Sequence, residues 1–494
     1  CLTRGQDPSA GAEPYDRARL VRRRRRGEPH GAQTAGCDVA RKVRTSDRHW
    51  RIALHRFHGA ELLHMGVSHM PRRSIAQGTG KRTGMYRVWN FLSGYSLLLV
   101  IGAVIALVWA NTSPESYHAL VDYVLIDNFF IGHPHSEGGE TVRTLTVHYL
   151  VNDVLMAFFF AIAAKEVWEA LILENGSLRG RKSMTPLIAT AGGMLGPIAV
   201  YLGLAMVLGV YETVSRGWAI PTATDIAFSY LVGRIVFGAG HPAIRFLLLL
   251  AIADDAGGLL ILAVFYPTGE LAPEWLLASL LASVAVFVLF NWLPLRLDRG
   301  NPMRPNSTWV RKRLSFWPYA LAGAASWYAF QEAGIHPALG LIPIIPAIPH
   351  ADRGFGIFAE AERHLKDLLN TTEHALKVPV EIILLFFGLM NAGVEFSAIS
   401  EPTWLVLAGL VVGKPVGIFL FGWFAARVLR LGLPTGMELA DLFVLGCVAA
   451  IGFTVALFVA TVAFAGGPFQ GAAMMGALLS FFASVIAIVA GRFL

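Results

Sequence analysis

Charge is scarce in this chain. Asp, Glu, Lys and Arg make up only 15% of its 494 residues, whereas hydrophobic residues make up 55%. This composition excludes a soluble globular protein and indicates a chain that crosses a membrane many times. Cysteine is rarer still, and the three that occur, Cys1, Cys37 and Cys447, lack the spacing of metal ligands. Cys447 lies in an apolar run, where we expect a small buried side chain.

The net charge of +7 is spread unevenly, because many of the arginines precede Met85. Five of them form the run 22–26. A basic run can bind nucleic acid or anionic lipid, but we interpret this one as part of a disordered tail and expect no nucleic-acid partner. Because the chain starts with Cys1 instead of Met, we interpret residues 1–84 as an extension outside the native protein and residues 85–494 as one transmembrane domain.

Apolar runs recur from residue 90 to the end of the chain. Most have about the 20 residues that span a bilayer as a helix, so we predict about twelve membrane helices. The eighth run is short and is broken by Pro343, Pro346 and Pro349, so we expect a helix that does not cross alone. The predicted helices cover residues 90–110, 145–172, 184–209, 218–237, 243–266, 273–294, 314–332, 334–349, 375–395, 402–428, 439–464 and 470–493.

The loops between these runs alternate in charge. The second loop carries Arg179, Arg181 and Lys182, whereas the ninth carries Glu395 and Glu401. The sixth loop holds six basic residues, which are Arg296, Arg299, Arg304, Arg311, Lys312 and Arg313. Because basic loops stay in the cytoplasm, the even loops and both termini are predicted to be cytoplasmic.

Two adjacent acids, Asp254 and Asp255, stand in the middle of the fifth run, and residues 246–266 carry no other charge. A charged Asp at the centre of a membrane helix costs about 2.5–3.5 kcal/mol on insertion scales. Packing does not explain two such residues in a row. We therefore predict that the two carboxylates form an ion or proton site.

A helix break is predicted near the middle of the fourth run, where Pro221, Thr222, Thr224 and Asp225 follow closely. Proline removes a backbone donor and interrupts a helix. Inside a membrane, such a break is tolerated where it lines a cavity or is buried in protein. Freed backbone and threonine oxygens are hard ligands suited to Na⁺ or Li⁺, and the helix ends add dipoles. The alternative is a proline kink with Asp225 in a structural pair.

A second break is predicted at Gly452, within the run 439–464. The two breaks fall in the middle helix of two three-helix groups, residues 184–266 and 402–493. Interrupted helices at corresponding positions are typical of transporters built from inverted repeats. The predicted fold is therefore an all-α polytopic membrane protein with inverted-topology repeats and two broken helices that cross at the midplane.

Lys414 lies near the middle of the tenth run, where a lone ammonium group needs a partner. The candidates at this depth are Asp254, Asp255 and the C-terminal ends of the broken helices. Adjacent helical residues point about 100° apart. Lys414 can therefore pair with Asp254 and leave Asp255 free for an ion.

Four further titratable residues are weaker candidates. Asp153 and Glu166 lie in the second run, and we place both near helix ends or on the walls of a funnel. His336 precedes Pro337 and is expected to be a hydrogen-bonded helix-end residue rather than a sensor. Glu373 opens the ninth run on the predicted cytoplasmic side, and the same interpretation applies to it.

The first loop has the pattern of an extracytoplasmic β-hairpin. Two β-rich runs, 128–131 and 141–145, flank a turn at Gly138 and Gly139. The edge of such a hairpin can pair with a second copy of the chain. An unstructured loop is the alternative.

Taken together, these motifs resemble the NhaA-type sodium/proton antiporters, a family of inverted-repeat transporters with broken helices. The resemblance runs in order over residues 88–494. The matching stretches are 152–157 (NDVLMA), 217–227 (GWAIPTATDIA), 250–257 (LAIADDAG), 334–336, 391–394 (NAGV), 413–418 (GKPVGI) and 452–454.

The resemblance implies roles for the central residues. Asp255 is implied to bind the cation and carry the proton, and Asp254 to pair with Lys414. Thr224 and Asp225 are implied to form the break of the fourth helix, with Asp225 offsetting helix dipoles. Members of the family are homodimers of twelve-helix subunits in the bacterial inner membrane, and the first-loop hairpin forms part of the dimer contact. No cofactor is implied.

The resemblance also links Glu373 to the response to pH. The chain departs from the family at 163–169 (AAKEVWE), where relatives usually carry a Gly-Leu-Glu-Val-Lys-Arg-Glu-like end of the second helix. Pro337 is a second departure. The departure at 163–169 leaves the ion core intact but affects the predicted pH regulation, and Pro337 indicates a divergent member of the family.

The predicted function is electrogenic exchange of internal Na⁺ or Li⁺ for external H⁺, which regulates cytoplasmic pH and sodium. In this hypothesis protons and Na⁺ compete for Asp254 and Asp255. An ion-coupled solute symporter is the alternative, but the sequence offers no added polar cluster for an organic substrate. An intramembrane aspartyl protease would need its acids on separate helices with a Gly-x-Gly-Asp motif, which is missing, so no enzyme activity is expected.

Overall fold

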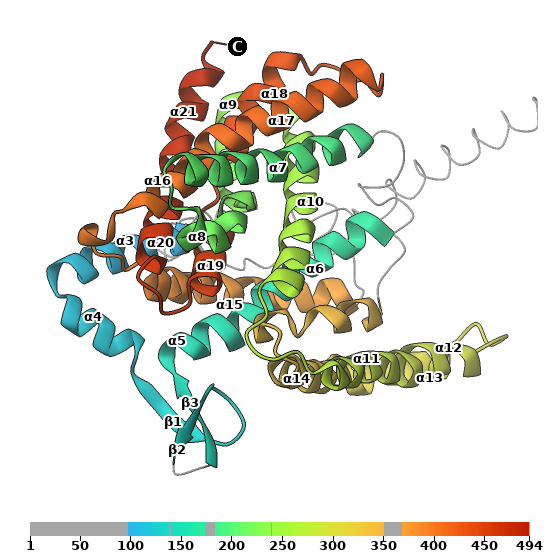
Figure 1. The fold of residues 1–494 in the computed structure, drawn as a ribbon. Coiled ribbons are helices and arrows are strands. Elements are labelled where there is room, and N and C mark those ends of the chain that lie inside the picture. The colour runs from blue at the N-terminus through green and yellow to red at the C-terminus, as the bar shows by residue number, and fades with distance from the viewer. Residues whose placement is uncertain (1–96, 138–139, 173–182, 239, 350–367, 494) are drawn as a thin grey trace, which may run out of the picture. The chain divides into compact units, whose positions relative to one another are not determined.

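The computed structural model describes residues 97–137, 140–172, 183–238, 240–349 and 368–493 (Figure 1). Within these ranges the chain is mostly helical and carries one three-stranded sheet. The predicted extension 1–84 lies outside the described residues, as do the start of the first predicted helix and the Gly138-Gly139 turn.

Six helical segments of the described chain are long and apolar enough to cross a membrane. They are Val147–Ile172, Met184–Val207 (α7), Pro242–Phe265 (α10), Pro273–Leu297, Glu401–Val428 and Gln470–Gly491. Helices α18 (Leu439–Ala449) and α19 (Phe453–Ala463) pass the same test as a pair bent by 52°, which makes a seventh span. All seven coincide with predicted runs, because in lipid an apolar segment satisfies its backbone within a helix.

Four of these segments contain local changes of helix type. They divide into α5 (Val147–Tyr149), η1 (Leu150–Leu155) and α6 (Met156–Ile172); α11 (Pro273–Phe287), η4 (Val288–Trp292) and α12 (Leu293–Leu297); α16 (Glu401–Ala408), η10 (Gly409–Gly413), α17 (Lys414–Trp423) and η11 (Phe424–Val428); and α20 (Gln470–Leu479), η12 (Ser480–Phe482) and α21 (Ala483–Gly491). Segments η1 and η10 are π-helical turns, which are wider than α-helical turns and frequently occur at functional sites.

The other predicted runs form shorter or more polar helices, which are α3 (Leu97–Thr112), α9 (Ile226–Phe237), α14 (Trp317–Glu332) and α15 (Leu368–Asn391). Helix α15 begins at Leu368, so the start predicted at 375 is wrong. Its first turns contain Glu373, His374 and Lys377, which lower the hydropathy but are compatible with a helix. The proline-rich eighth run forms only two 3₁₀ turns, η6 (Pro337–Leu339) and η7 (Ile342–Ala347).

The first loop forms a three-stranded antiparallel sheet next to α4 and α5 in Figure 1. Its strands β1 (Val124–Asn128), β2 (His133–Glu137) and β3 (Glu140–Thr146) stand in the order β1-β3-β2. The prediction of a strand at 128–131 is wrong, because Oδ1 of Asn128 accepts hydrogen bonds from the N–H groups of Phe130 and Ile131 and turns the chain there. A hairpin is present in this loop, as predicted, but β3 pairs with β2 at 133–137 instead of with 128–131, and the unstructured alternative is wrong.

Short helices complete the described chain. They are α4 (Pro114–Val121), α8 (Tyr211–Val214), η3 (Ser215–Thr222), α13 (Pro305–Trp309), η5 (Val310–Leu314) and η9 (Phe396–Ala398).

Glycines bring α7 and the segment around α17 into backbone contact. A Cβ atom on Gly192 would lie 2.3 Å from the carbonyl oxygen of Gly417, and one on Gly196 would lie 2.3 Å from that of Gly413. Small residues allow close packing between membrane helices. This contact holds the start of α17, where Lys414 lies, against the core of the helix bundle.

Candidate ion-binding site

The chain leaves helical geometry completely at the first predicted break. Helix η3 ends at Thr222, Ala223 is extended with ψ 150°, and α9 begins at Ile226. The simple proline kink is therefore wrong for this position. The second break separates α18 from α19 at residues 450–452, as predicted around Gly452.

The two breaks lie against each other and share hydrogen bonds. The N–H group of Asp225 donates to the carbonyl oxygen of Ile451 at 2.7 Å. The hydroxyl of Thr224 donates to the carbonyl oxygen of Ala449 at 3.2 Å, and that of Ser229 donates to Val448 at 3.0 Å. Each break thus binds backbone groups that the other leaves without helical partners, which is why both can exist in an apolar bundle.

Asp225 lies at the N-termini of two half-helices. Its carboxylate accepts hydrogen bonds from the N–H group of Phe228 at 3.0 Å, from the N–H group of Thr454 at 3.4 Å and from the Thr454 hydroxyl. These donors belong to the first turns of α9 and α19. A negative charge is stabilised at such helix ends by the orphan N–H groups and the dipole.

The side chain of Lys414 lies at the C-terminal end of a broken helix, where a positive charge is stabilised. Its ammonium group is fully buried and lies 2.8 Å from Oδ2 of Asp254. It also donates a hydrogen bond to the carbonyl oxygen of Thr222, at the C-terminal end of η3. The pair of Lys414 with Asp254 predicted from the sequence is therefore present, and so is its contact with a broken-helix end.

Asp255 lies beside this pair and opens into a small cavity of about 10 Å³. Asp254 also lines the cavity, and its Oδ1 atom is buried without a hydrogen-bond partner in the described chain. The remaining walls are apolar, from Phe159, Phe160, Ala163, Ala223, Gly258, Leu259, Leu262 and Val455. Two carboxylates, one held by Lys414 and one held by no hydrogen bond or ion pair among the described residues, can take up a small cation or a proton.

Glu166 and Glu373 belong to a separate cluster around Lys165 of α6. The Lys165 ammonium lies 2.6 Å from Glu373, 2.9 Å from Glu169 and 3.4 Å from Glu166. All four side chains are buried. The sequence reasoning missed Lys165 and Glu169, although their spacing of four residues on one helix is a signal for an ion pair.

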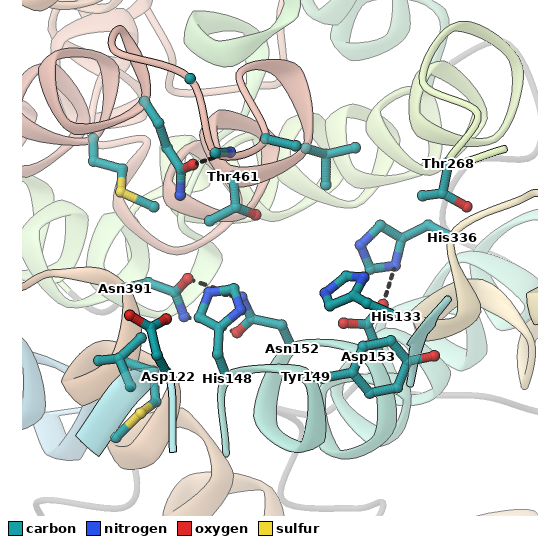
Figure 2. Close-up of a pocket in the computed structure, with 18 of the residues that line it drawn as sticks. Asp122, His133, His148, Tyr149, Asn152, Asp153, Thr268, His336, Asn391 and Thr461 are labelled. Atoms are coloured by element: carbon teal, nitrogen blue, oxygen red, sulfur yellow. Dashed lines mark hydrogen bonds and ion pairs between the residues drawn. The ribbon is translucent and has the colours of Figure 1, made fainter. Parts of the chain in front are cut away.

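Asp153 and His336 lie on the wall of a cavity of about 1290 Å³ near the sheet. Figure 2 shows them beside His133 of β2, whereas His148 of α5 lies next to Asn152 and Asn391; the sequence reasoning missed both of these histidines. Nδ1 of His336 is 3.6 Å from the Asp153 carboxylate and accepts a hydrogen bond from the N–H group of Ala338 at 3.3 Å. His336 is thus a hydrogen-bonded helix-end residue, as expected.

Phe458 of α19 is fully buried between this cavity and the ion-binding residues. Its ring centroid is 4.8 Å from that of His336 on one side and 4.8 Å from that of Phe160, a wall of the Asp255 cavity, on the other.

The site residues predicted from the sequence form three groups. Asp225, Asp254, Asp255, Thr224 and Lys414 gather at the broken helices, whereas the pairs Asp153–His336 and Glu166–Glu373 stand apart from them.

A family model described as Na⁺/H⁺ antiporter 1 matches residues 89–494. The chain belongs to the Na⁺/H⁺ antiporter 1 family. This confirms the family resemblance, and the apolar helices of this family member are those of a multi-pass membrane protein.

Curated relatives match the same part of the chain. The Na(+)/H(+) antiporter NhaA of Jannaschia sp. (strain CCS1) is 69% identical over 411 residues, which are 83% of this chain and 98% of that protein. NhaA of Desulfitobacterium hafniense (strain DSM 10664 / DCB-2) is 46% identical over 82% of this chain and 95% of that protein. NhaA of Geobacter sulfurreducens is 43% identical over 82% of this chain and 97% of that protein.

Among solved structures, the sodium proton antiporter MjNhaP1 from Methanocaldococcus jannaschii covers 83% of this chain and 98% of its own length. The TM-score is 0.42 and the identity is 14%.

The position of Asp225 predicts how its substitution affects stability. Asp225→Ala removes the acceptor shared by two helix N-termini and is expected to destabilise the protein by about 2 kcal/mol or more. Asp225→Asn keeps an acceptor but loses the charge, so a smaller loss of about 1 kcal/mol is expected. Thermal unfolding of the purified protein in detergent measures both. Equal melting temperatures for the wild type and both variants would contradict the assignment.

Proposed function

We propose that this family member exchanges Na⁺ or Li⁺ for H⁺ across the membrane, with Asp255 and Asp254 as the carboxylates that bind the ions. One observation carries the proposal: Lys414 holds Asp254 at the crossing of the two broken helices, next to a small cavity into which Asp255 opens. The relatives that match this chain over nearly their whole length are named Na(+)/H(+) antiporters.

Competition between the two ions follows from the chemistry of the site. An ionised carboxylate in an apolar cavity is unfavourable unless a positive charge or a proton neutralises it. Either Na⁺ or a proton can neutralise Asp255, and occupancy by one removes the charge that attracts the other. An empty, charged site is costly to expose to the apolar barrier. Only protein that has bound Na⁺ or H⁺ therefore switches the site from one side of the membrane to the other.

The exchange is proposed to be electrogenic. The site contains two acids and one lysine, so it can carry more protons than sodium ions in one cycle. Each net charge moved across the membrane corresponds to about 2.3 kcal/mol per 100 mV. The membrane potential then drives extrusion of Na⁺ in exchange for external H⁺, which regulates cytoplasmic pH and sodium.

The size of the cavity favours exchange of small ions over symport of an organic solute. A volume of about 10 Å³ beside Asp255 is close to what a single water-sized probe occupies. The pairing of Asp254 with Lys414 also differs from the free pair of acids on separate helices that a protease needs.

The proposed architecture has twelve membrane helices with inverted repeats. The seven long spans, together with α3, α9 preceded by η3, α14, the η6–η7 segment and α15, account for this number. Each of the two three-helix groups has its broken helix in the middle. Residues 85–494 are proposed as the transport domain, in agreement with a family match from residue 89.

The proposed location is the bacterial inner membrane, with both termini in the cytoplasm. The alternating charge of the loops supports this orientation. The extracytoplasmic side then carries the sheet and the large cavity with Asp153 and His336. The cytoplasmic side carries the Lys165 cluster with Glu166 and Glu373, which is proposed to respond to pH.

A homodimer through the sheet is also proposed. In the order β1-β3-β2, strands β1 and β2 are the edges, and an edge strand presents unpaired backbone groups to a second copy. Val124, Leu125 and Ile126 on β1 and the adjoining Phe129 and Phe130 are exposed apolar residues, which suit such a contact.

The experiment that tests the function is a pH-gradient assay in inverted vesicles that contain the protein. Na⁺, Li⁺ and K⁺ are added in turn at several pH values, and recovery of a quenched pH-sensitive dye reports proton efflux. We expect recovery with Na⁺ or Li⁺ and none in vesicles without the protein. Recovery that needs an organic solute would instead favour a symporter.

A further inference from the structure

Helix α15 contains a buried carboxylate that the exchange scheme does not use. Only 8% of the Glu381 surface is exposed. Its Oε2 atom is buried and has no hydrogen-bond partner in the part of the chain that the structure describes. An ionised carboxylate in such a place is costly, because nothing replaces the water it has lost. Glu381 therefore needs a proton or a functional reason to persist.

Two contacts with the second span establish the depth of Glu381. Near one end of α15, Glu373 pairs with α6, and near the other end Asn391 forms hydrogen bonds of 2.9 and 2.8 Å with η1. Glu381 follows Glu373 by eight residues and precedes Asn391 by ten, which are about 12 and 15 Å along a helix. Phe160, a wall of the Asp255 cavity, lies within the corresponding interval of the second span. Glu381 is therefore at about the depth of the ion site.

Few charged groups surround Glu381. Lys377 precedes it by one helical turn on α15, and Asp225 acts on it electrostatically from the helix break. Helices α3 and α19, both packed against α15, carry no charged residue in the described chain, whereas η1, which is also packed against α15, carries the buried Asp153. On α6 the charged residues are those of the Lys165 cluster, which contacts α15 at Glu373. Glu381 is thus coupled by charge to the ion site through Asp225.

We propose that Glu381 is a third protonatable carboxylate of the transporter, whose negative charge, when its proton leaves, strengthens cation binding at Asp255. This inference rests on the proposed exchange function and adds a residue to it. Glu381 acts through its field rather than by touching the ion, so it is a positioning residue. Glu381 releases its proton to the aqueous side to which the ion site is open, and it takes up a proton from that same side.

Glu381→Gln tests this role, because glutamine has nearly the same shape and never becomes charged. At alkaline pH, where the wild-type carboxyl is ionised, the variant is expected to raise the KM for Na⁺ about threefold to tenfold. This is the size of effect expected when one charge that does not touch the ion is removed from a partly polar interior. At acidic pH, where the wild-type carboxyl is protonated, the two KM values are expected to agree.

The measurement uses purified protein in proteoliposomes, with KM for Na⁺ determined across the pH range. Glu381→Asp keeps the acid and is expected to restore most of the alkaline affinity. Glu274→Gln, at an exposed position in the first turn of α11, is the matched control and should follow the wild type. A KM for Glu381→Gln equal to that of the wild type at every pH would overturn the proposal.

Infrared difference spectra after a pH jump give a second readout that does not depend on transport. We expect a carbonyl band of a protonated carboxylic acid in the wild type, a shifted band in Glu381→Asp and loss of the band in Glu381→Gln. If Glu381→Gln does not fold, an Asp variant with an unshifted band overturns the inference. Absence of exchange by the wild type refutes the proposed function itself, whereas an active wild type with an unaffected Gln variant refutes only the role of Glu381.

Discussion

Asp255→Asn is expected to reduce Na⁺-dependent proton flux to the background of vesicles without the protein, a loss of more than about 100-fold. The amide cannot take up the proton and contributes no net charge to cation binding. A single charge contact at about 4 Å is worth about 4 kcal/mol in a partly polar protein interior, and each 1.4 kcal/mol is a factor of ten. The dye assay in inverted vesicles, corrected for the amount of inserted protein, measures this loss.

Two comparisons make the Asp255 result specific. Because asparagine is close to aspartate in shape, the variant is expected to insert and to melt within a few degrees of the wild type. Asp127→Asn, an exposed acid on β1, is the matched control and should keep full exchange. Sodium-dependent proton flux that persists in Asp255→Asn would contradict its assignment as the ion-carrying residue.

Lys414→Met is expected to cause the largest loss of stability in the core. The substitution keeps the apolar stem that packs near Gly193 of α7 but removes the one positive charge that pairs with Asp254 among the described residues. It also leaves the carbonyl oxygen of Thr222 without its donor. Breaking a buried pair by removing one partner costs about 3–5 kcal/mol. Thermal unfolding in detergent should show a clearly lower melting temperature.

The double variant Asp254→Asn/Lys414→Met separates the pair from the packing. Each single variant leaves the other member of the pair as a buried charge without its partner, whereas the double variant leaves no charge at either of these two positions. The double variant is therefore expected to be more stable than Lys414→Met alone, although it loses the contacts of the ammonium group. If the loss of stability in the double variant equalled the sum of the losses in Asp254→Asn and Lys414→Met, the two side chains would contribute independently, contrary to the geometry.

The helices and their breaks could be predicted because their signals are local. Seven long spans follow from apolar runs, and the two interruptions follow from Pro221 and Gly452. The pairing of Lys414 with Asp254 was also predictable, since few groups at that depth can neutralise an ammonium ion. Where local hydropathy fails, as near the start of α15, the boundary was wrong because Glu373 of α15 pairs with Lys165 of α6, a contact between helices that hydropathy does not report.

Contacts between distant segments could not be predicted in the same way. The spacing of Lys165 and Glu169 indicates their pair on α6, but nothing in the sequence links Lys165 to Glu373 of α15. His133 reaches the large cavity from β2, and its strand was placed wrongly because the turn at Asn128 overrides the β pattern. Glu381 was overlooked because a glutamate one turn from a lysine is typical of a helix surface.

Cation binding to the purified protein at several pH values tests the central claim most directly. The dissociation constant for Na⁺ and the number of protons released on binding are measured by calorimetry in buffers of different ionisation enthalpy. If cation and proton compete for the same carboxylates, binding must release protons, and affinity must weaken up to about tenfold for each pH unit below the titration of the site. Na⁺ affinity that stays constant with pH, without proton release, would contradict the account.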